Sequence, residues 1–132
     1  RGPALAIAGA AALKFTETCG THAEAYSAAE VLHGPARIVE SGSPVLALAA
    51  RDAAESSVAE ITGRLAGQGA RAFITSTRSG AATALPFAPG GHPLTDALAL
   101  IASFYAFVEA LSRHRGFNPD QPPHLRKVTE TL

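Results

Sequence analysis

Apolar stretches of two lengths alternate with short polar turns along this chain, and this pattern predicts a protein of mixed helices and strands. The stretches at residues 4–18 and 93–114 have the length of helices. The first follows Pro3, and proline suits a first helical turn because its missing N–H would have no partner there. Gly20 and Gly116 come after the two stretches, and glycine commonly ends a helix.

A shorter helix is predicted at residues 22–32. Thr21 and Glu24 have the spacing of a capping box, in which each side chain bonds the other residue's backbone N–H. Pro35 disfavours the α conformation in the residue before it, so the helix must stop at that point. We expect a short extended piece at residues 37–39.

The middle of the chain predicts a β-α-β unit. Residues 45–49 form a continuous apolar run of strand length, and residues 71–76 form a second strand. Between them, Asp52 and Glu55 are a second predicted capping pair, for a helix that ends near Gly67. A strand, a helix and a strand in about thirty residues predict parallel strands joined by a right-handed crossover.

A third short strand is predicted at residues 83–87. Before it, residues 77–80 form a polar loop at the carboxyl end of the second strand, where open α/β sheets place their ligands. The Ser-Gly pair in this loop could bind an anion through backbone N–H groups, although such pairs are common.

The last long helix is apolar on all sides, which indicates burial from more than one direction and an interface along it. Its core face is predicted from helical spacing. The positions on that face are Leu94, Leu98, Ile101, Phe104 or Tyr105, Val108 and Leu111.

Composition narrows the class of protein. The 132 residues suffice for one domain, and 47% hydrophobic with 17% charged residues is typical of a globular chain. Basic and acidic residues balance at 11 each, which argues against a nucleic-acid or membrane-surface partner. The single Cys19 favours a reducing, cytoplasmic location. Because the chain starts at Arg1 and contains no methionine, we expect it to be the carboxyl-terminal part of a longer polypeptide.

Ionisable side chains concentrate between Glu17 and Pro35. A carboxylate such as Glu17 and an imidazole such as His33, placed at helix ends, could move protons on a small molecule. The simpler alternative is that Glu17 is a solvated helix end, His33 a turn residue and Lys127 part of a solvated basic tail. Metal binding is disfavoured because the histidines lack the close spacing of a zinc helix, and no nucleotide-cofactor motif is present.

Several segments resemble the second sugar isomerase (SIS) domain of the glucosamine-6-phosphate synthase and deaminase family. They are Arg1-Gly2-Pro3 and residues 12–17, 22–26, 30–35 and 118–129. The resemblance implies a three-layer α-β-α sandwich with a mainly parallel sheet, as the carboxyl-terminal half of a chain with two such domains. It divides this chain into an SIS domain at residues 1–117, lacking its first strand, and an active-site tail at residues 118–132.

The resemblance also implies a chemistry. Such proteins interconvert the aldose and ketose forms of a hexose 6-phosphate or amino-sugar 6-phosphate, with amine transfer or release and no cofactor. Glu17 would shuttle the proton between carbons 1 and 2, and Lys127 would form a Schiff base with the open-chain ketose. His33 would assist ring opening across the interface of a homodimer. The family's phosphate-binding loop lies in the first SIS domain, and no match to it occurs in this sequence.

Two departures favour the deaminase or isomerase branch over the glutamine-dependent synthase. Phe15-Thr16 stands before Glu17 where synthases commonly have Leu-Lys, and the tail at residues 123–128 also differs. Two further hypotheses remain open, namely a non-catalytic sugar-phosphate sensor of a regulator and an inactive half that only completes a dimer.

Overall fold

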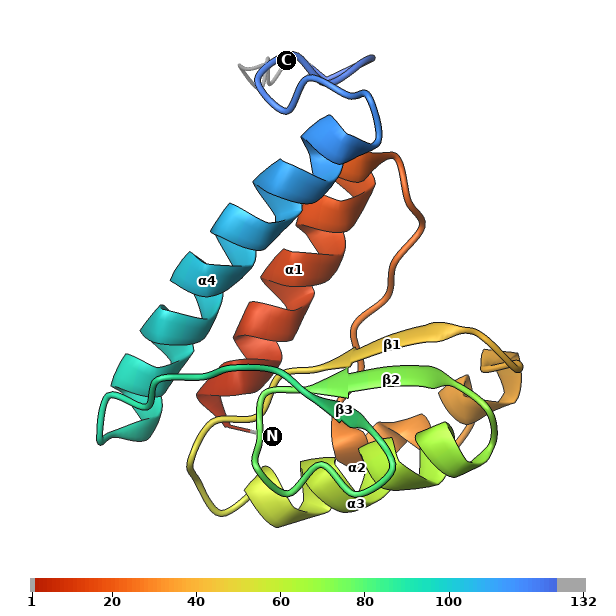
Figure 1. The fold of residues 1–132 in the computed structure, drawn as a ribbon, viewed down its shortest axis with the longest axis vertical. Coiled ribbons are helices and arrows are strands. Elements are labelled where there is room, and N and C mark those ends of the chain that lie inside the picture. The colour runs from red at the N-terminus through yellow and green to blue at the C-terminus, as the bar shows by residue number, and fades with distance from the viewer. Residues whose placement is uncertain (1, 126–132) are drawn as a thin grey trace, which may run out of the picture.

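The chain folds into three layers, a parallel sheet between two layers of helices (Figure 1). The computed structural model describes residues 2–125. Its elements are α1 (Pro3–Cys19), α2 (Ala28–Val31), the 3-10 turn η1 (Pro35–Ile38), β1 (Pro44–Ala47), α3 (Glu55–Gly67), β2 (Arg71–Ile74), β3 (Thr83–Ala84) and α4 (Pro93–His114). This architecture is the predicted α-β-α sandwich.

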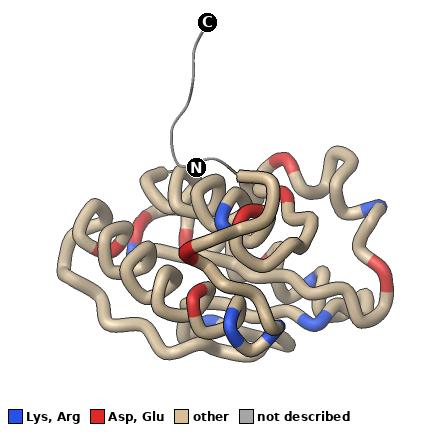
Figure 2. The backbone as a smooth tube through the Cα atoms, turned by 90° about the horizontal axis from the view of Figure 1, so that it is seen from above, with Lys and Arg blue, Asp and Glu red and all other residues tan. Residues whose placement is uncertain are grey.

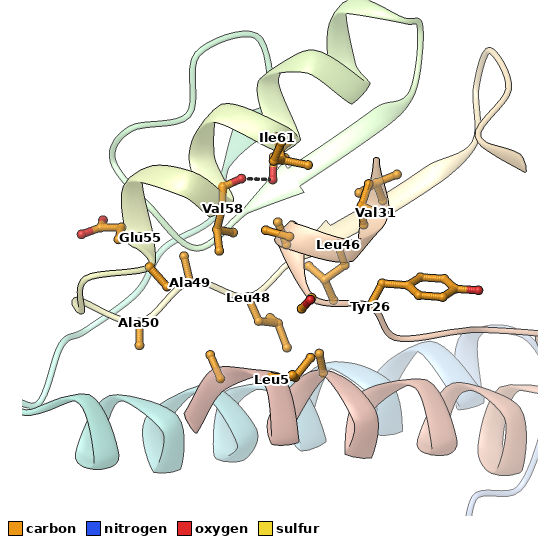
Figure 3. A pocket seen from close by; sticks show the side chains of 18 of the residues that line it. Leu5, Tyr26, Val31, Leu46, Leu48, Ala49, Ala50, Glu55, Val58 and Ile61 are labelled. Atoms are coloured by element: carbon orange, nitrogen blue, oxygen red, sulfur yellow. Dashed lines mark hydrogen bonds between the residues drawn. The ribbon is translucent and has the colours of Figure 1, made fainter. Parts of the chain in front are cut away.

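The sheet has the order β1-β2-β3, and both pairs are parallel. Val45 lies opposite Ala72, and Phe73 lies opposite Thr83. The predicted β-α-β unit is therefore confirmed, with α3 as its helix. Helices α1 and α4 cover one face of the sheet, and α3 with the short α2 covers the other (Figures 1 and 3). The third strand is shorter than predicted.

Apolar clusters on both faces hold the layers together. Between α1 and α4, Phe104 and Val108 are each 4% exposed and pack with Ala11, and the Phe15 and Phe104 rings meet edge to face at 5.2 Å. On the other face, Ile74 of β2 is fully buried in a second cluster. Burying a side chain such as Phe104 contributes about 1.5–3 kcal/mol relative to leaving it exposed.

The predicted helix at residues 22–32 is wrong in most of its length. Helix α2 begins only at Ala28, and the chain before it is not helical. The capping box forms six residues later than predicted, between Ser27 and Glu30: the Glu30 carboxylate accepts from the Ser27 backbone N–H at 3.3 Å and from the Ser27 hydroxyl at 2.7 Å. Glu24 instead accepts a hydrogen bond from the Tyr26 hydroxyl.

Two local predictions need smaller corrections. Of residues 37–39, predicted to be extended, the first two belong to the 3-10 turn η1 and only Val39 is extended. Asp52 and Glu55 do not form a capping box, although the helix they predicted exists: Asp52 Oδ1 accepts from the Ala54 N–H at 2.8 Å. Glu55 instead forms an ion pair with Arg51 at 3.0 Å.

The predicted core face of α4 is confirmed in its later turns, where Phe104 and Val108 are buried and Ile101 and Leu111 pack against them, and is wrong at its start. Leu94 and Leu98 are 59% and 67% exposed, whereas Leu100, predicted off the core face, is 2% exposed. A helix that is apolar all round has no single face that periodicity can select, so polar anchors such as Asp96, fully buried, determine its rotation. By length and composition alone α4 could also cross a membrane, a test that the core helix of a soluble protein passes as well. The predicted interface along α4 stays a prediction.

Candidate active site

Glu17 lies near the carboxyl end of α1 in an ion pair that sequence reasoning missed. Its carboxylate is 2.5 Å from the Lys14 ammonium, one turn earlier on the same helix, and both side chains are partly exposed. The spacing of three residues between Lys14 and Glu17 was the available signal. The ion pair restricts the orientation of this partly exposed carboxylate.

The end of α1 that carries Glu17 is fixed to the end of α4. The Ser112 hydroxyl donates to the Thr18 carbonyl at 2.6 Å. Gly20 then takes a left-handed conformation with φ of 56°, and a Cβ added there would lie 3.5 Å from the Phe117 ring. The carboxyl-terminal tail therefore begins beside the helix end that carries Glu17.

Lys127, the predicted Schiff-base residue, lies outside the described residues.

His33 lies in the other helical layer. It occupies the turn between α2 and η1, where its side chain is exposed. Figure 1 shows α2 beside α3, on the far side of the sheet from α1. One copy of the chain therefore keeps Glu17 and His33 in separate helical layers.

An exposed cluster precedes α2. His22 Nε2 is 3.4 Å from one oxygen of Glu24, and the Tyr26 hydroxyl donates to the other. The hydrogen bond to Glu24 raises the pKa of Tyr26 above its usual 10.0, with smaller contributions from desolvation and the Glu24 charge. His22 and Glu24, predicted to begin a helix, instead belong to a segment without regular secondary structure.

The polar loop predicted to bind a ligand lies far from Glu17. It follows β2 at the carboxyl edge of the sheet, where α1 begins. Glu17 is fourteen residues further along α1, which at 1.5 Å per residue places it about 21 Å away along the helix.

The polar side chains at this edge form hydrogen bonds and an ion pair with one another. Glu55 Oε1 accepts from the Ser76 hydroxyl at 2.7 Å and from Arg51 Nη1 at 3.0 Å. The same Arg51 nitrogen donates to the Thr75 carbonyl at 2.9 Å, and its guanidinium stacks 4.8 Å above the Phe87 ring. This network connects the carboxyl ends of β1 and β2 and has a structural role.

Asp96, which sequence reasoning passed over, anchors α4 to the same edge. Its carboxylate is fully buried and accepts from the backbone N–H groups of Arg51 at 2.9 Å and Gly90 at 2.7 Å. The signal in the sequence was a lone acid in the first turn of a long apolar helix.

Basic and acidic positions are interspersed along the backbone (Figure 2). Within residues 2–125, no three His, Cys, Asp or Glu side chains lie together as a metal site would need.

Known proteins are similar to this chain in sequence and in fold. Glutamine–fructose-6-phosphate aminotransferases (isomerizing) of Caulobacter vibrioides and Aeropyrum pernix are each 33% identical over 133 residues, covering 96% and 97% of this chain. The chain spans 22% of the length of these relatives. No protein-family model matches it.

Two solved structures are also similar. A crystal structure assigned as a phosphosugar isomerase of Silicibacter pomeroyi DSS-3 is 55% identical with a TM-score of 0.83, over 88% of this chain and 36% of that one. The carboxyl-terminal domain of glucosamine-fructose-6-phosphate aminotransferase from Francisella tularensis has a TM-score of 0.72 at 22% identity, over 89% of this chain and 35% of that one, a likeness of fold. The chain therefore belongs to the sugar isomerase (SIS) domain family, and it corresponds to the second SIS domain of double-domain proteins.

Proposed function

We propose that this chain is the catalytic carboxyl-terminal half of a homodimeric, cytoplasmic enzyme that isomerises an amino-sugar 6-phosphate and releases its amine. The observation that carries the proposal is the position of Glu17. Its carboxylate is paired with Lys14 at 2.5 Å and lies at the end of α1, beside the end of α4 from which the tail departs. The names of the relatives, which contain both isomerase and aminotransferase activities, support the same class of substrate.

In the proposed reaction, Glu17 moves one proton. The carboxylate removes the proton from carbon 2 of the open-chain amino sugar and returns it to carbon 1, so that the aldose becomes a ketose imine. Water then adds to carbon 2 and ammonia leaves, which balances the reaction. A carboxylate that acts alternately as base and acid contributes about 10²–10⁴-fold to such a step.

The other two residues act before and after the proton transfer. His33 of the second subunit protonates the ring oxygen and opens the sugar, a role suited to an imidazole, which can both give and take a proton. Lys127 attacks carbon 2 of the ketose imine and displaces ammonia to form a Schiff base, and the water that adds to carbon 2 then hydrolyses this Schiff base, which frees the ketose and restores the lysine without any cofactor. The phosphate is held by the part of the protein outside this chain.

The glutamine-dependent synthase is the second candidate function, because the curated relatives carry that name. It differs in its nitrogen source. The deaminase releases ammonia from glucosamine 6-phosphate without glutamine, whereas the synthase needs glutamine to convert fructose 6-phosphate.

The test measures fructose 6-phosphate and ammonia formed from glucosamine 6-phosphate by the full-length protein. Glu17→Gln should lower kcat at least about a hundredfold, because the amide cannot accept the proton. Glu60→Gln, an exposed carboxylate on α3, is the matched control and should keep the wild-type rate. Lys127→Arg keeps the charge but forms no imine, so borohydride with fructose 6-phosphate should label wild type and not this variant.

Wild-type turnover in both Glu17→Gln and Lys127→Arg would end the proposal. A protein that binds sugar phosphates, turns over none of them and is not labelled would instead be the non-catalytic sensor.

A further inference from the structure

Ser112 lies where the end of α1, the end of α4 and the start of the carboxyl-terminal tail meet. Figure 1 shows α1 and α4 side by side, with both helices ending at the same end of their layer. The side chain of Ser112 is fully buried there. Its hydroxyl donates to the Thr18 carbonyl at 2.6 Å, across 94 residues of sequence. A buried serine of α4 therefore bonds the backbone one residue after Glu17.

The Thr18 carbonyl needs a partner from outside its own helix. The last four carbonyls of an α-helix have no intrahelical N–H, and Thr18 is the second-to-last residue of α1. The chain turns away directly afterwards, because Gly20 takes the left-handed conformation and its N–H bonds the Phe15 carbonyl. The Ser112 hydroxyl supplies the partner that the helix cannot. Removing this hydroxyl would leave the carbonyl beside Glu17 without its donor.

A second polar contact ties this helix end to α4, and it is weaker. The Cys19 thiol donates to the Val108 carbonyl at 3.7 Å, and a thiol is a weak donor. The apolar side chains between the two helices resist their separation. Burial of apolar surface has no direction, however, and does not prevent a small rotation or slide. The Ser112 hydrogen bond is directional, and so it fixes the position of the turn that carries Glu17.

The backbone of Ser112 holds the start of the tail. Its carbonyl accepts from the Phe117 N–H at 3.0 Å, and the Gly116 N–H donates to the Arg113 carbonyl at 2.9 Å. Because Gly116 is left-handed with φ of 83°, these two bonds form a Schellman motif. The Phe117 ring then lies beside Gly20, at the end of α1. Ser112 thus holds α1 through its side chain and the tail through its backbone.

We propose that Ser112 is a positioning residue for the proton transfer, whose hydroxyl sets where the Glu17 carboxylate lies relative to the start of the tail. This role rests on the function proposed above, because it needs Glu17 as the proton carrier and Lys127 as the amine. Ser112 itself is buried and takes no part in the chemistry. A misplacement of about 1 Å in a reacting group costs roughly a hundredfold in rate, so the loss of one hydroxyl should be visible in kcat.

The first test compares kcat and KM of full-length variants with glucosamine 6-phosphate. Ser112→Ala removes the hydroxyl and leaves the backbone bond to Phe117 in place. It should lower kcat at least about tenfold and keep KM within about twofold, because the proposed phosphate site lies outside this chain. Ser103→Ala, at an exposed serine of the same helix, is the matched control and should keep both values. Ser112→Cys keeps the shape with a weaker donor, so its kcat should lie between those of Ser112→Ala and wild type.

Borohydride labelling separates a change of position from a loss of folded protein. The tail keeps its own backbone bonds in Ser112→Ala, so fructose 6-phosphate should still be trapped on Lys127 to the wild-type extent. Labelling that falls in proportion to kcat would mean that Ser112 only holds the fold together, and would overturn the proposal. A kcat within about twofold of wild type in Ser112→Ala would also overturn it, as would the same result in Ser112→Cys if the alanine variant does not fold.

The rate of Glu17→Gln distinguishes failure of this role from failure of the proposed function. If wild type turns over no sugar phosphate, or if Glu17→Gln keeps the wild-type rate, the function is refuted and the role of Ser112 with it. If Glu17→Gln is inactive and Ser112→Ala is as active as wild type, the function stands and only the role of Ser112 is refuted.

Discussion

Replacing Asp96 by alanine should destabilise the fold more than the same replacement of any other Asp or Glu residue. Asp96→Ala leaves the N–H groups of Arg51 and Gly90, now bonded at 2.9 and 2.7 Å, without their acceptor. A buried donor that loses its partner costs about 1–3 kcal/mol, so the two together cost roughly 2–6 kcal/mol. Loss of a negative charge from the first turn of α4 adds about 0.3–1 kcal/mol.

This loss is large against the whole stability of a domain, which is about 5–15 kcal/mol. Asp96→Asn keeps one acceptor oxygen, so we expect it to lose about half as much. The assay is urea unfolding followed by circular dichroism, with amide exchange at Gly90 as a local reading. Asp120→Ala, an exposed acid in the tail, is the control and should stay within about 0.5 kcal/mol of wild type. If Asp96→Ala unfolds like this control, the carboxylate does not hold α4 to the sheet as argued.

Two further predictions concern α2 and the core. Hydrogen bonds from Ser27 lower the pKa of Glu30 below its usual 4.5, so this pair stabilises the fold at neutral pH and loses its contribution as the pH falls below 4.5 through the lowered value. Ser27→Ala should raise that pKa back in an NMR titration, and an unchanged value would contradict the assignment. Phe104→Ala should cost about 3–5 kcal/mol in the same urea assay, against less than 1 kcal/mol for the half-exposed Tyr105→Phe, and equal effects would refute the packing described.

The long elements were predictable because several local signals agreed at each of them. Helix α4 starts at Pro93 and ends at His114 as predicted, since a proline, an apolar run and a glycine all mark it. The helix at residues 22–32 failed because Thr21 with Glu24 and Ser27 with Glu30 have the same spacing. Only the tertiary path, which carries the chain from one helical layer to the other, decides which pair caps a helix.

The residues of the candidate site could be predicted from the sequence, but their positions relative to one another could not. Family resemblance selected Glu17 and His33, but nothing in the sequence indicated that they lie in different layers. Helical periodicity likewise favoured Leu94 and Leu98 for the core. It considers apolar positions only, and so it does not account for a buried polar residue such as Asp96. Whether a polar side chain is buried depends on partners that are distant in sequence. A single sequence does not show which residues those partners are.

Subunit complementation tests the central claim that residues from two copies form one active site. Full-length Glu17→Gln and His33→Ala proteins are each expected to be inactive. In a mixed dimer, one site contains both substitutions and the other contains neither, if His33 acts across the interface. Random mixing makes half of the dimers mixed, so the mixture should recover about one quarter of wild-type activity. A mixture as inactive as its two components would contradict a shared site and the proposed mechanism with it.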